Sequence, residues 1–373
     1  MYRTGVAKLP LHGGKAPGWL TSKMRKLAKE ISSIIIDEYG TDTFLTRISD
    51  PYWFQAFGCV LGYDWHSSGV TTVVTGVLKQ ALTPEENGLV FCGGKGRTSR
   101  KTPEEIVRNG ETFGFSNKTI QQLTYISKMT AKVDNTAIQA GYQLYHHVFI
   151  LTENKKWAVI QQGMSAQDRT ARRYHWLSDK TADLIVEPHN AIVGLKRPKV
   201  LNMTAKQSEG SRKTSVDLAK EPTNKLVRLL DAARPIHQKS LREWLPDTGI
   251  SSSLATLSMP RGMNWKTMKQ VYDFQPKNYE ELLSLKGVGP ATVRGLALIA
   301  ELVYGEKASW DDPVKYSFAY GGKDGVPFPV NRRAMEESIV VLRDAVTASR
   351  IADKEKLNSL QALRRFIPEN PKS

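Results

Sequence analysis

Residues 278–305 read NYEELLSLKGVGPATVRGLALIAELVYG, and this stretch decides how the C-terminal half of the chain is built. The pattern predicts two helices joined by a tight turn, with Asn278 as the N-cap of the first helix and Pro290 at the start of the second. Gly287 and Gly289 permit a turn that side chains would obstruct. Amide groups of the turn and of the second helix then face outward, where they form an anion site suited to a phosphate.

This stretch resembles the helix-hairpin-helix, a DNA-binding motif, over about 28 residues. Such a motif holds the phosphate backbone and reads no base, so the predicted binding is independent of DNA sequence and sensitive to salt. An αα-hairpin without a ligand is the alternative. The residues predicted to bind DNA here are Lys286, Gly287, Val288, Gly289, Thr292 and Arg294.

DNA glycosylases also contain this motif, with a lysine on the second helix and an aspartate downstream that carry the chemistry. The matching positions in this chain hold Ala291 and Asn331. An amide can neither deprotonate a nucleophile nor stabilise a cationic sugar by charge. Glycosylase activity is therefore the weaker alternative, and the resemblance favours DNA binding.

The whole chain is basic, with 53 Lys and Arg against 37 Asp and Glu, a formal net charge of +16 over 373 residues. This balance favours a polyanionic partner, most often nucleic acid, although solubility alone is an alternative. The 40% hydrophobic residues suffice for a core, and no apolar run reaches the length of a membrane span. Without an apolar leader, and with only two cysteines, we expect a cytoplasmic protein near the nucleoid and no membrane partner.

The periodicity predicts a mixed α/β domain over residues 1–210 and an all-helical domain over residues 211–373 that contains the motif at 278–305. In the first domain, Asp50 is expected to cap a helix, and residues 134–145 read as a helix. Residues 204–215, rich in Ser, Lys and Gly, predict a linker or mobile loop. Beyond them we expect helices at 217–231, 235–245, 264–273, 279–286, 290–304, 331–348 and 354–366.

A basic segment over residues 91–101 reads FCGGKGRTSRK. Its glycines would let backbone amides approach a phosphate, and its cations would neutralise the charge. It lacks the Walker spacing, so nucleotide hydrolysis is not indicated. A solvated loop is the alternative. The cations predicted to bind DNA are Lys95, Arg97, Arg100 and Lys101.

Residues 146–162 predict a β-hairpin around an Asn154-Lys155 turn, in a register that places His147 opposite Gln162. A segment over 169–175, read as a helix, would bring Arg172 and Arg173 to the same end as DNA contacts, and the helix that begins at Asp134 would enter there. We expect a site for cutting phosphodiesters from these groups, with His147, Gln162 and Asp134 as catalytic residues. An edge hairpin with solvated ends is the alternative.

Two short segments combine carboxylate and imidazole, namely Glu187-Pro188-His189 and Asp64-Trp65-His66. Such groups can bind Mg²⁺ or Mn²⁺ and orient water for attack on phosphate. Glu187 and His189 are therefore predicted as catalytic residues and, together with Asp64 and His66, as metal ligands. The spacings of familiar nuclease centres are not present in the sequence.

The chain also resembles, over nearly its full length, a bacterial and archaeal family described as a domain of unknown function. The segments that carry the resemblance are Thr4–Val6, Gly93–Gly96, Ser127–Met129, His146–Phe149, Gln161–Met164, Glu187–His189, Asn202–Thr204, the helix-hairpin-helix and residues 312–325. The resemblance implies a DNA-associated protein and a structure-specific nuclease, and it transfers no catalytic residue.

Together these features predict a metal-dependent DNA nuclease that acts on bubble, flap or junction DNA. The motif would hold the duplex, and the mixed domain would cut nearby. The main alternative is a non-catalytic DNA-binding or scaffolding protein in repair.

Overall fold

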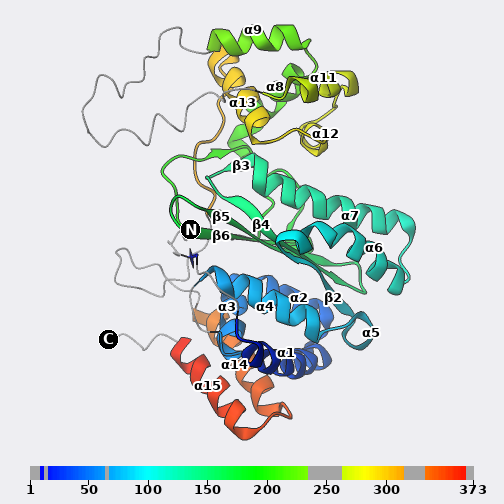
Figure 1. Cartoon of the computed structure of the whole chain (residues 1–373), viewed down its shortest axis with the longest axis vertical. Coiled ribbons are helices and arrows are strands. Elements are labelled where there is room, and N and C mark those ends of the chain that lie inside the picture. Colours follow the sequence, from blue (N-terminus) through cyan, green and yellow to red (C-terminus); the bar gives the residue numbers. More distant parts are fainter. Residues whose placement is uncertain (1–8, 12–15, 64–66, 234–262, 315–331, 367–373) are drawn as a thin grey trace, which may run out of the picture.

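The computed structural model describes residues 9–11, 16–63, 67–233, 263–314 and 332–366. It is a mixed protein in which helices cover both faces of an antiparallel sheet, with a further group of helices stacked beyond one face (Figure 1). This confirms the predicted mixed class. Among the described residues, no helix is long and apolar enough to span a membrane.

The main sheet has six strands in the order β1-β6-β5-β4-β2, and β7 also pairs with β6. Its strands are β1 (Leu9–Pro10), β2 (Leu89–Lys95), β4 (Gln143–Thr152), β5 (Trp157–Ser165), β6 (Thr170–Leu177) and β7 (Ala191–Val193). A small second sheet pairs β3 (Ile138–Gln139) with β8 (Leu201–Asn202). Because side chains alternate along a strand, β4, β5 and β6 supply apolar groups to two separate cores.

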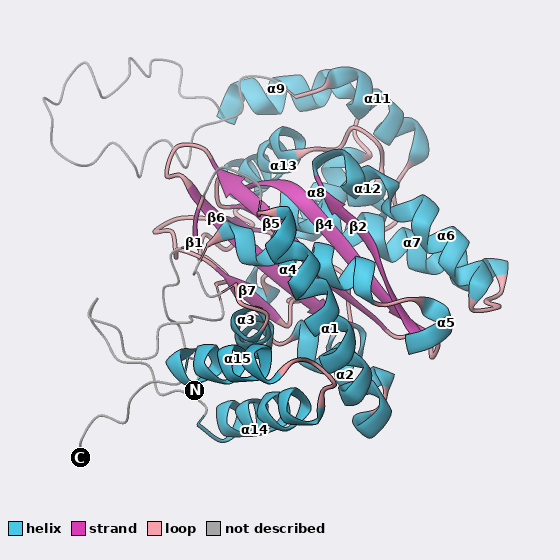
Figure 2. Ribbon diagram, turned by 60° about the horizontal axis from the view of Figure 1, so that its bottom comes forward, coloured by secondary structure: helices cyan, strands magenta, loops and turns pink. Residues whose placement is uncertain are grey.

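One face is covered by helices from both ends of the chain. The core there joins sheet residues such as Ile150 and Ile160 to Phe57 of α3 and Leu342 of α14. Figure 2 shows α14 and α15 beside the N-terminal helices. The helices of this layer are α1 (Gly18–Tyr39), α2 (Thr41–Ser49), α3 (Pro51–Val60), α4 (Ser68–Ala81), α5 (Pro84–Asn87), α14 (Arg332–Ala348) and α15 (Asp353–Phe366). Asp50 caps α3 as predicted, because its carboxylate accepts from the amides of Tyr52 and Trp53.

The opposite face carries the second core, which joins Phe149 and Val159 of the sheet to Met129 of α7 and continues to Leu296 of α13. Its helices are α6 (Thr102–Thr112), α7 (Asn117–Lys132), α8 (Glu209–Ala219), α9 (Thr223–Ala233), α11 (Trp265–Phe274), α12 (Tyr279–Ser284) and α13 (Pro290–Tyr304). Short turns are η1 (Gly96–Lys101), η2 (Val133–Ala137), η3 (Ser178–Lys180) and η4 (Lys206–Ser208). The domain boundary at residue 210 stays a prediction, and the predicted helix at 235–245 lies outside the described residues.

Four predicted elements are wrong. The expected helix at 217–231 is interrupted, because α8 ends at Ala219 and α9 begins at Thr223. Residues 134–145 are not a helix: a single π-helical turn, η2, ends at Ala137, and β4 begins at Gln143. Residues 170–177 form β6 instead of a helix, and residues 204–215 contain most of α8 instead of a linker. Ser211 and Ser215 are buried in α8, and the Ser215 hydroxyl donates to the Ser211 carbonyl, so small polar residues pack there instead of remaining solvated.

The predicted hairpin exists, but its register differs by one residue. His147 pairs with Gln161 and His146 with Gln162, so the predicted pairing of His147 with Gln162 is wrong. The turn has an extra residue because Lys155 adopts a left-handed conformation with φ 64°, and its amide donates to the Thr152 carbonyl. A one-residue shift moves every side chain to the other face, and His147 and Gln162 therefore face different cores.

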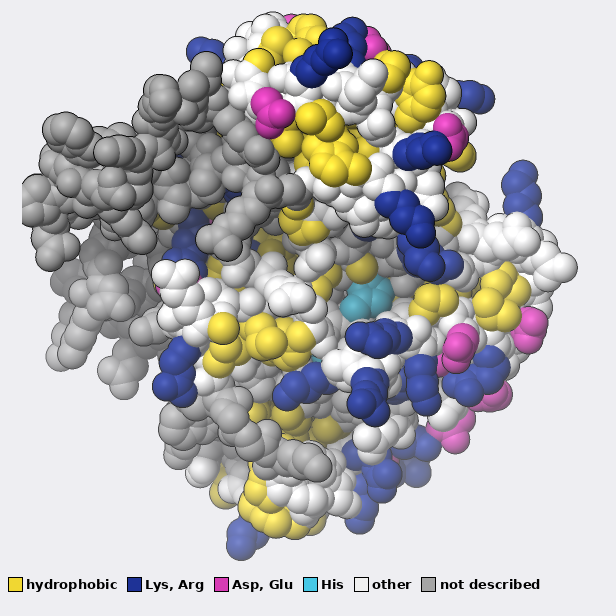
Figure 3. All heavy atoms as spheres, turned by 45° about the horizontal axis from the view of Figure 1, so that its top comes forward, with side chains coloured by type: hydrophobic (Ala, Val, Ile, Leu, Met, Phe, Trp, Pro, Cys, Tyr) yellow, Lys and Arg dark blue, Asp and Glu magenta, His cyan; other side chains and the backbone are white. Residues whose placement is uncertain are grey.

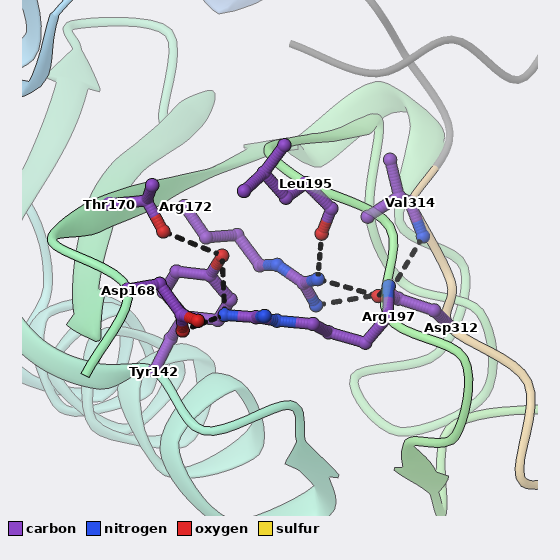
Figure 4. A network of polar contacts seen from close by, with 8 residues as sticks. All are labelled: Tyr142, Asp168, Thr170, Arg172, Leu195, Arg197, Asp312 and Val314. Atoms are coloured by element: carbon purple, nitrogen blue, oxygen red, sulfur yellow. Dashed lines mark hydrogen bonds and ion pairs between the residues drawn. The ribbon is translucent and has the colours of Figure 1, made fainter. Parts of the chain in front are cut away.

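A buried ion pair joins β6 to the segment that follows α13. Both guanidinium NH₂ groups of Arg172 donate to the Asp312 carboxylate, at 3.0 and 2.6 Å, and one also donates to the Leu195 carbonyl at 2.7 Å (Figure 4). The ring of Tyr142 lies 4.6 Å from the guanidinium carbon. Removing one member of such a pair leaves an uncompensated buried charge, which costs about 3–5 kcal/mol. The pair therefore fixes the segment that follows α13 against the sheet.

Candidate functional site: a histidine pocket at the sheet edge

Asp134, in the π-helical turn after α7, places a fully buried carboxylate beneath the sheet. A buried charge must be compensated by donors or by an opposite charge. Trp176 donates its indole N–H to Oδ2 at 3.0 Å, Gln161 donates its amide to the same oxygen, and the His189 Nε2 contacts Oδ1. Both carboxylate oxygens are therefore occupied within the fold.

The Asp134 carboxylate fixes the orientation of Gln161. The Gln161 Nε2 donates to Asp134 and, at 3.0 Å, to the Thr130 carbonyl, and both of these groups can only accept. The Gln161 Oε1 is thus the acceptor that faces His147, and it lies 2.7 Å from the His147 Nδ1. His147 must carry its proton on Nδ1, which leaves Nε2 with a free lone pair.

The lone pair of His147 Nε2 faces Ser127 on α7, at 2.9 Å from the hydroxyl oxygen. Burial lowers the pKa of His147 below its ordinary value of 6.5, although the bond with Gln161 and the charge of Asp134 act in the opposite direction. The imidazole is consequently neutral near pH 7. A neutral imidazole with an oriented acceptor nitrogen has the form required of a general base.

Ser127, His146 and His147 line a pocket of about 190 Å³ where β2 ends beside β4. Its remaining lining comes from η1, α6, α7 and the start of β4, and includes Arg100, Lys128 and Tyr145. Figure 3 shows histidine atoms in a hollow of the surface, with Lys and Arg side chains beside them. We call this site the histidine pocket. Its volume is that of about six water molecules, at about 30 Å³ each, which gives room for a phosphate group.

Four predicted DNA contacts lie beside this pocket. Lys95, Arg97, Arg100 and Lys101 are exposed on the end of β2 and on η1, and we call them the basic rim. One glycine of this segment, Gly93, has a different role from the predicted one. Gly93 has φ 100°, and a Cβ there would lie 2.3 Å from the His147 carbonyl oxygen. Its amide donates to Glu105, so Gly93 serves the close pairing of β2 with β4.

The other face of the sheet end carries a second polar group around His146 and Gln162. The Gln162 Oε1 accepts from the Thr71 hydroxyl at 2.5 Å, and its Nε2 donates to Tyr145 and to the Ser68 carbonyl. The Thr75 hydroxyl donates to the Thr71 carbonyl, so the His146 Nε2 donates to Thr75 across 3.1 Å. Gln162 therefore lies on the opposite face of the sheet from His147, where its side chain bonds to α4, and not beside His147 as predicted.

Arg172 and Arg173 are fully buried on β6, which removes them as the predicted phosphate contacts. Arg172 is paired with Asp312, and the Arg173 Nε donates to the His175 Nε2 at 2.8 Å. Burial lowers the pKa of Arg173 to about 9, and the ring of Phe54 lies 4.6 Å from its guanidinium carbon. Both guanidinium groups are enclosed in the interior and do not reach the surface.

The two predicted metal ligands within the described residues, Glu187 and His189, contact different partners. His189 is buried against Asp134, whereas Glu187 is exposed and lies 3.8 Å from Lys206. Over the described ranges, no three His, Cys, Asp or Glu side chains are placed to hold a metal ion. Asp64 and His66 lie outside those ranges.

The turn between α12 and α13 spans residues 285–289, and Asn278 caps α12 as predicted. Gly287 has φ 91°, and a Cβ there would lie 2.4 Å from the Thr267 hydroxyl, so this position requires glycine. A Cβ on Gly289 would meet no atom closer than 3.9 Å. Lys286 is exposed, whereas Val288 and Thr292 are buried. The side chain of Thr292 therefore cannot make the predicted contact with DNA.

Helix α7 connects this turn with the histidine pocket. The Lys132 ammonium group, at the end of α7, donates to the Leu285 carbonyl of the turn at 3.1 Å. Ser127 and Lys128 lie one turn or more earlier on the same helix. Five residues of helix span about 8 Å at about 1.5 Å each. Arg294 is partly buried and donates to Gln139 at 2.9 Å, which further fixes α13 against β3.

A larger pocket of about 780 Å³ lies between residues 183–186, α8 and the start of α12. Its lining mixes acids and bases, and it includes no histidine or cysteine. Arg212 in this wall donates to the carbonyls of Met203 and Ala205. The histidine pocket is therefore the stronger candidate for chemistry despite its smaller volume.

Sequence reasoning named His147, Asp134 and His189 as catalytic residues, with His189 in a separate cluster, but it missed Ser127, Gln161 and Trp176. The correct hairpin register would have found Gln161 as the partner of His147. Ser127 and Trp176 carry no local signal, because their contacts join residues 20 and 42 positions apart in the chain.

Comparison with known proteins gives one family. The family model described as "Protein of unknown function (DUF763)" matches residues 5–330. Searches of curated proteins and of solved structures returned no match.

The buried histidines predict a loss of stability in acid. Burial holds the pKa of His146 at about 3, and the nearby His147 and Lys95 act in the same direction. In the unfolded chain His146 binds a proton near pH 6.5, whereas in the folded chain it stays neutral down to about pH 3. The free energy of unfolding therefore falls as pH decreases from about 6.5 toward 3. For His146 the loss between pH 7.5 and 5 is about 2 kcal/mol.

Urea unfolding at pH 7.5 and 5 should show this loss in the wild type, and H146Q should reduce it by about 2 kcal/mol because glutamine does not titrate. An identical pH dependence in the two proteins would contradict the assignment.

Proposed function

The chain belongs to the DUF763 family of proteins of unknown function, and we propose that it binds DNA through the phosphate backbone and cuts phosphodiester bonds at the histidine pocket. The observation that supports cutting is the oriented imidazole of His147 beside cationic side chains. The neutral Nε2 can accept a proton from a nucleophile, and Arg100 and Lys128 line the same pocket.

The α12–α13 turn supports the binding part of the proposal. Two helices joined by a turn that contains Gly287 are what a helix-hairpin-helix requires, and Lys286 is exposed in this turn. Since α7 joins this turn to the histidine pocket, one duplex could contact both while the backbone is held independently of sequence. Binding of this kind would associate the protein with the nucleoid.

We also propose that cutting is directed to bubbles, flaps or junctions, because a recess of about 190 Å³ admits an unpaired strand more readily than a duplex. The proposal retains Mg²⁺ or Mn²⁺ as the expected ion. Asp134 is engaged by three donors, so ligands for the ion would have to include other groups, among them Asp64 and His66. A bound ion would supply charge at the scissile phosphate.

Replacing the four residues of the basic rim with alanine should weaken binding to duplex DNA and reduce its salt dependence. Each lost phosphate contact removes about 0.9 from the slope of log affinity against log salt concentration. The control removes the same charge from α1, at Lys23, Arg25, Lys26 and Lys29, which lie in the other helical layer. We expect the rim variant to lose at least one such contact and the control to keep the wild-type slope. Equal slopes in all three proteins would show that the rim is merely solvated.

H147Q should reduce the cleavage rate of a bubble substrate by about 100-fold or more, since general base catalysis contributes about 10²–10⁴. Binding of the same substrate should be unchanged, because binding is assigned to the turn and the rim. E38Q, at an exposed position of α1, is the control and should cut normally.

The assay compares bubble, flap and duplex DNA with Mg²⁺, Mn²⁺ or EDTA. We expect EDTA to abolish cutting. Binding without cutting under every condition would favour the scaffold alternative over the nuclease.

A further inference from the structure

Ser127 occupies an unusual position for a serine within a helix. A helical serine commonly bonds to the carbonyl four residues earlier, yet the Ser127 hydroxyl lies 2.9 Å from the His147 Nε2. Because Gln161 holds the His147 proton on Nδ1, the hydroxyl must be the donor in this bond. Ser127 therefore directs its only proton toward a base at the wall of the pocket.

The order of groups is hydroxyl, imidazole and an orienting acceptor, which is the arrangement that activates a serine nucleophile. An amide as third group fails where it turns its NH₂ toward the imidazole and forces the wrong tautomer. Here Thr130 and Asp134 occupy the NH₂ of Gln161, so the amide presents its oxygen. Gln161 and Asp134 are thus positioning residues for the pair.

From this geometry we infer that Ser127 is a nucleophile that attacks a phosphoryl group bound in the histidine pocket. This inference deepens the proposed function and takes its substrate class from it. The cations Arg100 and Lys128 line the same pocket, and a phosphodiester carries the complementary charge.

The reaction would proceed in two balanced steps. The Ser127 Oγ forms a bond to phosphorus while its proton passes to the His147 Nε2, and the bond from phosphorus to the sugar oxygen breaks. That oxygen leaves with the electron pair and takes the proton from His147. Water then attacks the phosphoserine and gives its proton to His147, which passes it to the departing Oγ. The sum of the steps is hydrolysis.

A small alkyl fluorophosphonate tests the nucleophile without DNA. Attack on its phosphorus displaces fluoride and leaves a stable phosphonyl group on the serine. Full-length protein would be treated with the reagent, and peptide mass spectrometry would locate the label. We expect the label on Ser127 in the wild type, none at that position in S127A, and a rate at least 100-fold lower in H147Q.

Ser99 is the matched comparison, because it lines the same pocket while its hydroxyl donates to the Gly96 carbonyl instead of a histidine. Ser99 should therefore carry no label in the wild type, since no imidazole accepts its proton. Absence of label on Ser127 in the folded wild type, or equal labelling of H147Q, would overturn the inference. Mapping the label in the wild type keeps the test valid if S127A does not fold.

The outcomes separate this inference from the proposed function. DNA cutting without a label on Ser127 would leave the nuclease and assign the attack to water activated by His147. A label on Ser127 without DNA cutting would leave the nucleophile and remove DNA as its substrate.

Discussion

A carboxylate without exposed surface must obtain every hydrogen bond from the protein, and Asp134 imposes this constraint on the centre of the fold. Trp176 from β6, Gln161 from β5 and His189 from the segment before β7 all direct polar groups to it. One charge thus fixes the turn after α7 against two strands and a loop. The same charge orients Gln161, and through it sets the tautomer of His147. The contacts of Asp134 that hold these elements together therefore also orient the side chains of Gln161 and His147.

The sheet separates this polar group from another that serves a structural purpose. Neighbouring residues of β4 face opposite cores, so His147 belongs to the Asp134 side and His146 to the side of α4. Both histidines line the pocket, because the pocket forms where β2 ends beside them. Helix α7 runs from the pocket to the α12–α13 turn, where the Lys132 ammonium group donates to the Leu285 carbonyl. The proposed phosphate contact at this turn and the oriented imidazole of His147 would suit a polyanionic chain better than a small neutral ligand.

The amino-acid sequence predicted α11 and α13 to within one residue at each end, and Asn278 caps α12 as expected. These features depend on local chemistry, namely caps, glycine and proline. It failed where distant contacts decide. The arginines of 169–175 read as part of a helix that contacts DNA, yet Arg172 is buried and paired with Asp312. Because Asp312 lies 140 residues away in the chain, no local pattern indicates this pair. The hairpin register depended on one left-handed residue, Lys155, and that single shift hid the pairing of Gln161 with His147.

The central claim is that Asp134, through Gln161, holds the proton of His147 on Nδ1, while burial keeps the ring neutral and leaves the Nε2 lone pair to accept a hydrogen bond. Nitrogen-15 NMR of the imidazole side chains measures this directly, and the signals missing from H147Q assign the residue. We predict at pH 7 a protonated Nδ1 and an unprotonated Nε2 with the chemical shift of a hydrogen-bond acceptor. A proton on Nε2 in a neutral ring, or an imidazolium at pH 7, would contradict the account.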